Sequence, residues 1–396
     1  MADRPALSLD EALELRLDSP PYDDSHRAWQ ESLRRFLEAE IAPHATEWDE
    51  AGAVPAEAHR ACAAFGLTGL GYPEAYGGWS DGVDILHHVI TSLEWGRLGA
   101  GGVTTALSTH AIGLPPLLAG GSDALKARVV PGVISGEAII GLAVTEPGAG
   151  SDVAGLATRA EAVDDGFVVN GEKTYISGGL RADYLTVAVR TGDAGAGGIS
   201  LLLMDMRAPG VSRTELPKQG WWASDTASIH FDGARVPADH LIGPLHGGFP
   251  LIMRNFNIER LSMSAIAIGA SRRCLADALA WARERRTFGR RLADHQVIRH
   301  QLMDMYRQIA AAQAWLEQVA GRLRDGAPVA ADIALLKVQA SQLMEFCARE
   351  ASQILGGASY IRGTAVERIY REVRVVAIGG GSEEILKDLA ARQAGI

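Results

Sequence analysis

The spacing of apolar residues changes twice along this chain, and the changes divide it into three segments. Up to about residue 140, apolar positions recur at helical intervals. From Gly141 to Ile242, short runs rich in β-branched and aromatic residues alternate with turn residues, and after that the helical period returns. We therefore expect an α+β fold. Its predicted parts are an N-terminal all-α domain, a middle β-domain and a C-terminal four-helix bundle domain, over residues 1–140, 141–242 and 243–396.

Two long apolar stripes in the last third predict the bundle. Over residues 298–323 and 333–354, apolar side chains recur in steps of four and three, and each stripe stops at a glycine-containing segment. A helix through Glu259 and a last helix over residues 383–392 bring the number of helices to four. The stripes are long enough to leave apolar surface for assembly between subunits.

In the middle segment, Asn170-Gly171 is a strong signal for a tight turn. The strand-like runs 167–169 and 173–177 flank it, which predicts a β-hairpin at this dipeptide. The chain has neither a G-x-G-x-x-G fingerprint after a strand nor a Walker A sequence, which excludes these two nucleotide-binding classes.

Composition narrows the class of protein. With 396 residues, 47% of them hydrophobic and 22% charged, the chain is typical of a soluble globular protein. The net charge of -10 argues against a nucleic-acid surface. Cys62, Cys274 and Cys347 form no C-x-x-C pair, so neither a disulfide framework nor a metal site is expected. Because the N-terminus is acidic and no apolar run has membrane-spanning length, we expect a cytoplasmic protein with no membrane span.

Three segments have the composition of ligand loops or anion sites. Residues 143–152 contain Pro147, Gly148 and Gly150, which fix and then free the backbone, although an ordinary strand-ending turn has the same composition. Five arginines surround the Thr-Phe-Gly sequence at residues 287–289, where they either bind phosphate or complement a helix dipole. The glycines at 379–381 lead into a helix whose first amides either receive an oxygen ligand or are simply capped by Ser382.

Glu259 interrupts an otherwise apolar helix face. Its neighbours three residues before and four residues after are Phe256 and Met263, and neither can pair its charge. Burial would raise the pKa of this carboxyl toward that of a general base. A solvent-exposed stripe end or a distant salt bridge is the alternative.

Together these segments resemble the acyl-CoA dehydrogenase family of flavoproteins, in order, from about Trp29 to Gln393. The resemblance is carried by Ala-Val-Thr-Glu-Pro-Gly-Ala-Gly-Ser-Asp from Ala143, Asn-Gly-Glu-Lys-Thr-Tyr-Ile-Ser from Asn170, Glu-Arg-Arg-Thr-Phe-Gly from Glu284, His-Gln from His295, Gln-Ile-Leu-Gly-Gly from Gln353 and Ile-Gly-Gly-Gly-Ser-Glu-Glu-Ile from Ile378.

The resemblance implies FAD as cofactor and fatty acid metabolism as the setting. The residues implied to hold FAD are Val144, Thr145, Tyr175, Ser177, Arg285, Phe288, Gln296, Gln353, Gly356, Gly357, Ser382 and Glu384. The residues implied to bind substrate are Ser151, Arg260 and Gly380. Because Arg285 and Gln353 are implied to reach the cofactor of a neighbouring subunit, a homotetramer is expected. An electron-transferring flavoprotein is the implied electron acceptor.

The chain departs from the common family pattern at Gly380, where most members carry the catalytic Glu. Isovaleryl-CoA and long-chain-type members instead place it on a bundle helix, in a Glu-Arg pair that Glu259-Arg260 matches. The resemblance thus implies that Glu259 is the base in dehydrogenation of acyl-CoA to trans-2-enoyl-CoA. A flavin oxidase or monooxygenase on the same fold, a dehydrogenase of carrier-protein thioesters and a flavin-free scaffold protein stay open as alternatives.

Overall fold

The structure, a computed structural model, describes residues 9, 17 and 21–396. The acidic N-terminal positions on which the expectation of a cytoplasmic protein partly rests lie outside the described residues. The chain groups into two compact units. The helical unit comprises the described residues of Met1–Ala42 together with Asp84–Gly101 and Arg260–Ile396, and the mixed unit comprises Pro43–Val83 and Gly102–Glu259.

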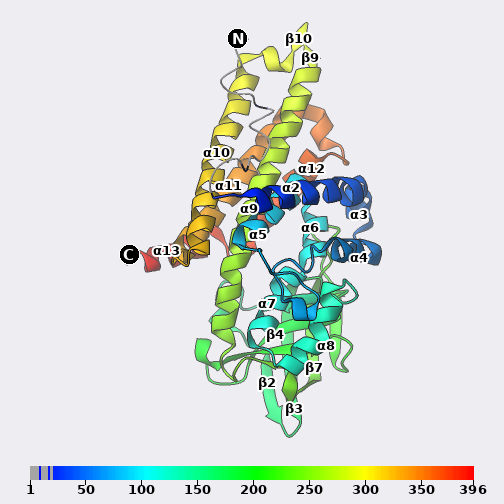
Figure 1. The fold of residues 1–396 in the computed structure, drawn as a ribbon, viewed down its shortest axis with the longest axis vertical. Coiled ribbons are helices and arrows are strands. Elements are labelled where there is room, and N and C mark those ends of the chain that lie inside the picture. The colour runs from blue at the N-terminus through cyan, green and yellow to red at the C-terminus, as the bar shows by residue number, and fades with distance from the viewer. Residues whose placement is uncertain (1–8, 10–16, 18–20) are drawn as a thin grey trace. The chain divides into compact units, whose positions relative to one another are not determined.

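The helical unit is arranged around α11 (Ala330–Leu355), which packs against helices from both earlier and later in the chain. These are α10 (Gln296–Arg324), which runs beside it (Figure 1), α12 (Ala365–Ile378) and α13 (Glu383–Gln393). The stripe predicted over residues 333–354 is buried, as expected of a bundle core. The remaining elements are α2 (Asp24–Phe36), η1 (Leu37–Ile41), α5 (Ile85–Arg97), the later part of α9 (Gly248–Glu284), β9 (Arg286–Thr287), β10 (Arg290–Arg291), η7 (Leu292–Asp294) and η8 (Gly356–Tyr360).

A polar cluster lies at the N-termini of α2 and α5. His26, Asp84 and His87 bring three potential metal-ligand atoms within 4.8 Å of one another. The Nδ1 atom of His26 accepts the Asp23 amide at 3.1 Å, and the Nδ1 atom of His87 accepts the Asp84 amide at 3.2 Å. Asp23 and Asp84 are in turn the N-caps of the two helices. We therefore assign the cluster to helix capping.

The mixed unit contains an eight-stranded sheet with the order β6-β7-β3-β2-β4-β5-β8, and β1 pairs with β4 in parallel. The strands are β1 (Ile140–Ala143), β2 (Arg159–Val163), β3 (Gly166–Ser177), β4 (Tyr184–Arg190), β5 (Ile199–Asp205), β6 (Val211–Glu215), β7 (Thr226–Pro237) and β8 (Leu241–Ile242). The helices are α3 (Ala45–Ala51), α4 (Ala56–Phe65), α6 (Gly101–Ser108), α7 (His110–Gly120), α8 (Asp123–Ile134) and the start of α9, with short 3₁₀ turns η2 (Ala42–His44), η3 (Glu74–Tyr76), η4 (Val153–Gly155), η5 (Ala196–Gly198) and η6 (Ala238–His240).

Strand β5 shows why the middle segment reads as a continuous apolar run. Leu201 and Leu203 belong to a core that includes residues of α7 and α8, whereas Leu202 and Met204 belong to a second core between strands. Side chains alternate between the two faces of a strand, so a strand buried on both faces is apolar at every position.

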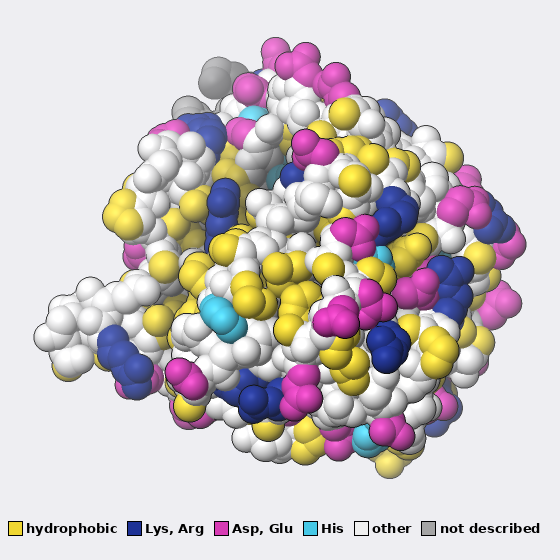
Figure 2. Space-filling model, turned by 90° about the horizontal axis from the view of Figure 1, so that it is seen from below, with side chains coloured by type: hydrophobic (Ala, Val, Ile, Leu, Met, Phe, Trp, Pro, Cys, Tyr) yellow, Lys and Arg dark blue, Asp and Glu magenta, His cyan; other side chains and the backbone are white. Residues whose placement is uncertain are grey.

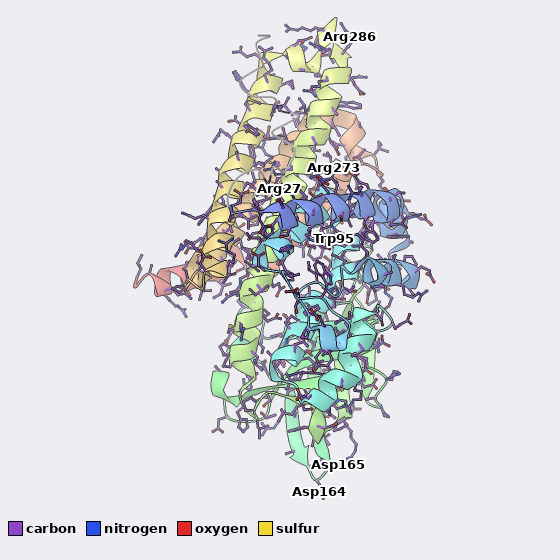
Figure 3. The ribbon with its side chains drawn as sticks, in the orientation of Figure 1. Arg27, Trp95, Asp164, Asp165, Arg273 and Arg286 are labelled. Atoms are coloured by element: carbon purple, nitrogen blue, oxygen red, sulfur yellow. The ribbon has the colours of Figure 1, made fainter. Side chains whose placement is uncertain are left out.

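The hairpin predicted at Asn170-Gly171 is wrong, because β3 runs through both residues without a turn. The turn lies instead at Asp164 and Asp165, at the tip between β2 and β3 (Figure 3). The register between β3 and β7 shifts at Gly171, whose φ is +140°. A Cβ there would lie 2.7 Å from the Cα of Thr158, so the dipeptide marks an irregularity in a strand rather than its end.

Acidic, basic and apolar side chains are interspersed over the face that Figure 2 shows, so the net charge of -10 is not gathered into one acidic field there. Among the helices of the described residues, none combines the length and apolar composition that crossing a membrane requires. The α+β architecture, with helices before and after a β-rich middle, is as predicted.

Candidate active site

The loop that follows β1 is held to β3 by a buried ion pair. Lys173 is fully buried, and its Nζ donates to the carbonyl oxygen of Val144 at 2.9 Å and to the Glu146 carboxylate at 2.7 Å. The Glu146 carboxylate also accepts the amides of Ala157 and Thr158, at 2.6 and 2.9 Å. One carboxylate therefore ties the start of the loop, its end and β3 together.

The pKa values of this pair reflect its burial. Burial lowers the pKa of Lys173 to about 8, against the opposing effect of the Glu146 charge. Burial alone would raise the pKa of Glu146, but the Lys173 ammonium and the two loop amides outweigh it and hold the pKa below its usual range. Both groups are thus charged near neutral pH.

The structure brings four predicted cofactor residues together beside this pair. Val144 and Thr145 begin the loop, and the Thr145 carbonyl accepts the Thr174 amide at 2.9 Å. Tyr175 follows at an irregularity of β3, with φ +59° and 71% of its surface exposed, and Ser177 ends the strand. A non-glycine residue at positive φ is uncommon, and here it turns the aromatic ring out of the ladder.

The rest of the loop has an open side. A Cβ built on Gly148 or on Gly150 meets no atom within 4 Å, and Ser151 is exposed. A ligand could therefore approach the backbone closely along this stretch.

The mixed unit also holds a residue that the sequence did not single out. The Asp225 carboxylate accepts the Leu180 amide at 2.7 Å and the Arg181 Nε at 3.2 Å, and the Asp225 carbonyl accepts the Gly178 amide at 2.9 Å. It fixes the turn directly after Ser177. No periodicity points to such a residue, because its role depends on a strand far along the chain.

In the helical unit, two buried cations hold the glycine turn at residues 379–381. Arg260 Nε donates to the Gly380 carbonyl at 2.8 Å, and Lys337 Nζ donates to the Gly381 carbonyl at 2.8 Å. Gly380 has φ +67°, and a Cβ there would lie 2.7 Å from Met263 Sδ. The space next to Gly380 is therefore occupied by methionine sulfur.

The two acids after this turn are already engaged. Glu383 accepts from Ser341 Oγ at 2.7 Å and from Gln342 Nε2 at 2.8 Å. Glu384 is exposed, and its own amide and the Ser382 hydroxyl lower its pKa. Both are in the first turn of α13, where acidic residues complement the helix dipole.

Glu259 is half-buried on α9, where the sequence argument assumed deeper burial. Ile252 on the same stripe is fully buried, whereas Phe256 and Met263 are half-buried. Glu259 directly precedes Arg260, whose side chain is buried.

The remaining predicted cofactor residues form two exposed groups in the helical unit. Arg285, Phe288 and Gln296 are near the β9–β10 turn, where Figure 3 places Arg286, and Phe288 is 97% exposed. Gln353, Gly356 and Gly357 are exposed at the end of α11. Neither group belongs to the unit that contains the loop after β1.

Comparison with known proteins identifies the family. Residues 23–137, 141–234 and 246–395 match, in this order, the N-terminal, middle and C-terminal domains of acyl-CoA dehydrogenase. The chain belongs to the acyl-CoA dehydrogenase family. Members are oxidoreductases that act on a CH–CH group, and the family uses FAD.

Relatives match over nearly the whole chain. Acyl-CoA dehydrogenase AFT10-1 of Alternaria alternata is 38% identical, over 94% of this chain and 92% of its own. Mitochondrial isovaleryl-CoA dehydrogenase of Oryza sativa is 32% identical, over 94% and 91%. The crystal structure of a probable acyl-CoA dehydrogenase from Mycobacterium abscessus has a TM-score of 0.92 and 43% identity, with 96% of this chain and all of that chain covered.

The residues of this family member fit the family cofactor. The loop after β1 offers backbone that a ligand can approach at Gly148 and Gly150, and the ring of Tyr175 on β3 is exposed. Gly356 and Gly357 likewise leave open space where side chains would stand. Exposed aromatic and glycine positions of this kind suit a planar ring system and a pyrophosphate.

Proposed function

We propose that the chain catalyses FAD-dependent α,β-dehydrogenation of an acyl thioester, acyl-CoA to trans-2-enoyl-CoA, with Glu259 as the base. The observation that carries this proposal is the glycine turn: Met263 Sδ occupies the place of a side chain at Gly380, and Glu383 is engaged by α11. Arg260 donates to the carbonyl of Gly380, and Glu259 is the residue directly before Arg260 in the sequence.

In this mechanism the amide of Gly380 donates to the thioester oxygen, and Glu259 removes a proton from the α-carbon. Bound FAD would supply the acceptor for the hydride that leaves the β-carbon. The α and β C–H bonds break as the double bond forms, and the α-proton stays on Glu259. Arg260 holds the turn at Gly380, and Ser151 is proposed to contact the carrier arm of the thioester.

Val144, Thr145, Tyr175 and Ser177 are proposed to contact the flavin ring, and Ser382 and Glu384 to contact the cofactor from the turn before α13. Arg285, Phe288, Gln296, Gln353, Gly356 and Gly357 are proposed to hold FAD of a neighbouring subunit in a homotetramer. Phe288 is 97% exposed and is therefore available for such a contact. A monomer that keeps full FAD content in sedimentation would contradict it.

The substrate test is anaerobic mixing of the purified flavoprotein with acyl-CoA thioesters of different length and branching. Bleaching of the flavin by at least one thioester, and reoxidation by an electron-transferring flavoprotein, are expected. Rapid consumption of oxygen in place of that transfer would favour the oxidase or monooxygenase alternative. Reduction by an acyl-carrier protein alone would move the substrate from CoA to a carrier-protein thioester.

The base is tested with Glu259→Gln, which keeps shape and hydrogen bonding but cannot accept a proton. The variant should retain FAD while flavin reduction slows by about 10²- to 10⁴-fold. Glu383→Gln is the matched control and should stay within about tenfold of the parent, because Glu383 is engaged by α11. Glu384→Gln tests the other carboxylate of α13, which is proposed to contact the cofactor, so its FAD content is measured beside its rate. The reverse pattern would place the base on α13.

A further inference from the structure

The glycine turn before α13 needs side chains to fix its shape. Gly380 and Gly381 have φ of +67° and +108°, which glycine adopts without strain. Because glycine also has the widest choice of backbone angles, these two residues do not fix the turn by themselves. At the upstream end, the Gly379 amide donates to the Val375 carbonyl at 2.7 Å, which anchors the turn to α12. The amide of Gly380 comes directly after this anchor.

The downstream end is held by cations from two different helices. Arg260 of α9 and Lys337 of α11 donate to the consecutive carbonyls of Gly380 and Gly381, each at 2.8 Å. These two bonds fix the peptide planes on the far side of Gly380. Together with the anchor on α12 they restrict the orientation of its amide.

The ammonium group of Lys337 is buried at a cost in folding free energy. Its side chain is fully buried. Its α11 neighbours Ala334 and Val338 form an apolar cluster with Leu386. Burying an ammonium costs far more than burying an apolar side chain of similar size, such as methionine. Its ammonium nevertheless supplies a buried donor to the Gly381 carbonyl, which an apolar side chain cannot do.

We propose that Lys337 is a positioning residue for the reaction: by holding the Gly381 carbonyl it keeps the Gly380 amide aimed at the thioester oxygen, and its charge favours the enolate over the neutral thioester. This inference rests on the proposed function. The second effect follows because a fixed positive charge in a water-poor region stabilises negative charge that develops on the substrate.

The test compares Lys337→Met with Lys387→Met in the FAD-loaded proteins. Lys387 is an exposed lysine of α13 whose Nζ is 3.8 Å from Glu383, so its replacement removes the same charge close to the turn without touching the turn carbonyls. Three quantities are measured: FAD content, the rate constant and KM for flavin reduction, and the α-proton pKa of a bound thioester whose β-carbon is replaced by sulfur. This analogue ionises but transfers no hydride.

Lys337→Met should retain FAD, slow flavin reduction by about 10- to 100-fold with KM within about threefold, and raise the α-proton pKa of the bound analogue by about one to two units. Lys387→Met should change none of these. An unchanged pKa of the analogue in a folded, FAD-loaded Lys337→Met protein overturns the inference and leaves Lys337 a core residue.

A variant that does not fold and a parent that no thioester reduces have separate meanings. If Lys337→Met does not fold, Lys337→Gln keeps a hydrogen-bond donor without the charge, and the same shift in analogue pKa is required of it. If the parent protein is reduced by no thioester, the proposed function fails and the inference falls with it. If a thioester reduces the parent and the Lys337 variant has the same rate and the same analogue pKa, the inference about Lys337 fails while the proposed function stands.

Discussion

Among the described residues, the two largest fully buried side chains are lysines, one in each unit. Lys173 of the mixed unit holds a carbonyl of the loop after β1 and a carboxylate, Glu146. Lys337 of the helical unit holds a carbonyl of the glycine turn. In both places the backbone leaves regular structure, where its carbonyls lose their usual partners, and a buried ammonium replaces them.

The difference between the two lysines is in what else depends on them. The Lys173–Glu146 pair ties the two ends of the loop after β1 to β3. If this loop contacts the flavin as proposed, loss of the pair should lower cofactor binding and stability together. Lys337 acts on one turn, so its loss should lower the rate while FAD stays bound.

The largest effect is expected for Lys173→Met. It leaves the Glu146 carboxylate buried without its ammonium, and breaking a buried pair in this way costs about 3–5 kcal/mol of folding free energy. FAD should be lost on gel filtration, in contrast to Lys337→Met. Urea unfolding and the ratio of flavin to protein absorbance measure both. A Lys173→Met protein that keeps FAD and loses less than about 1 kcal/mol would erase the distinction between the lysines.

The pH dependence of stability gives a second, smaller test. The pKa of Lys173 is lowered from 10.5 to about 8 in the folded protein. Between these values the unfolded chain binds a proton that the folded chain has released, so this group makes stability rise with pH, by up to about 1.4 kcal/mol per unit. Below about pH 8 its contribution is constant.

The reference for this measurement is the double variant Lys173→Met/Glu146→Gln, in which the pair is neutral. The difference in unfolding free energy between parent and double variant should grow in favour of the parent from pH 8 to pH 10. A difference that is flat or shrinks over this range would show that Lys173 titrates near its ordinary value.

The sequence predicted features that depend on residues close together in the chain better than features that depend on distant residues. The stripe of α11 was found because helical periodicity is local and independent of other segments. Asn170-Gly171 was misassigned because whether such a dipeptide turns or forms an irregular strand depends on its pairing with β7, which lies about sixty residues away. The same sequence supports either outcome.

The candidate site was predictable only in part. Glu259 stays a prediction, which rests on a carboxylate that breaks an apolar stripe. The burial of Lys173 and Lys337 was not predicted, because lysine is usually exposed and a sequence pattern does not show its burial. Lys173 lies inside the quoted Asn-Gly-Glu-Lys motif, which was a signal that could have found it. Lys337 has no comparable mark, since its role follows from the return of α13 to α11.

A third prediction compares glycines of the two regions, beginning with Gly380→Ala. Its φ of +67° disfavours any side chain by about 1–2 kcal/mol, and the new Cβ would also lie 2.7 Å from Met263 Sδ. Loss of about 1–2 kcal/mol in urea unfolding, with slower flavin reduction, is expected. Adding Met263→Ala should relieve the contact but not the φ cost. Full recovery in the double variant would mean that the turn adapts and is not rigidly held.

The smallest effect on stability is expected for Gly148→Ala in the loop after β1. A Cβ there meets no atom within 4 Å, and the φ of Gly148 is not in the left-handed region. The free energy of unfolding should therefore stay the same or rise by about 0.4–1 kcal/mol. The added methyl group would nevertheless stand on the open side of the loop, where we propose that FAD binds. FAD should therefore dissociate faster from this variant, as measured by loss of flavin absorbance during dialysis. Gly197→Ala is the matched control, because Gly197 has the same open surroundings on a different loop. If both variants release FAD as slowly as the parent, the open side of the loop after β1 is not the side that faces the cofactor.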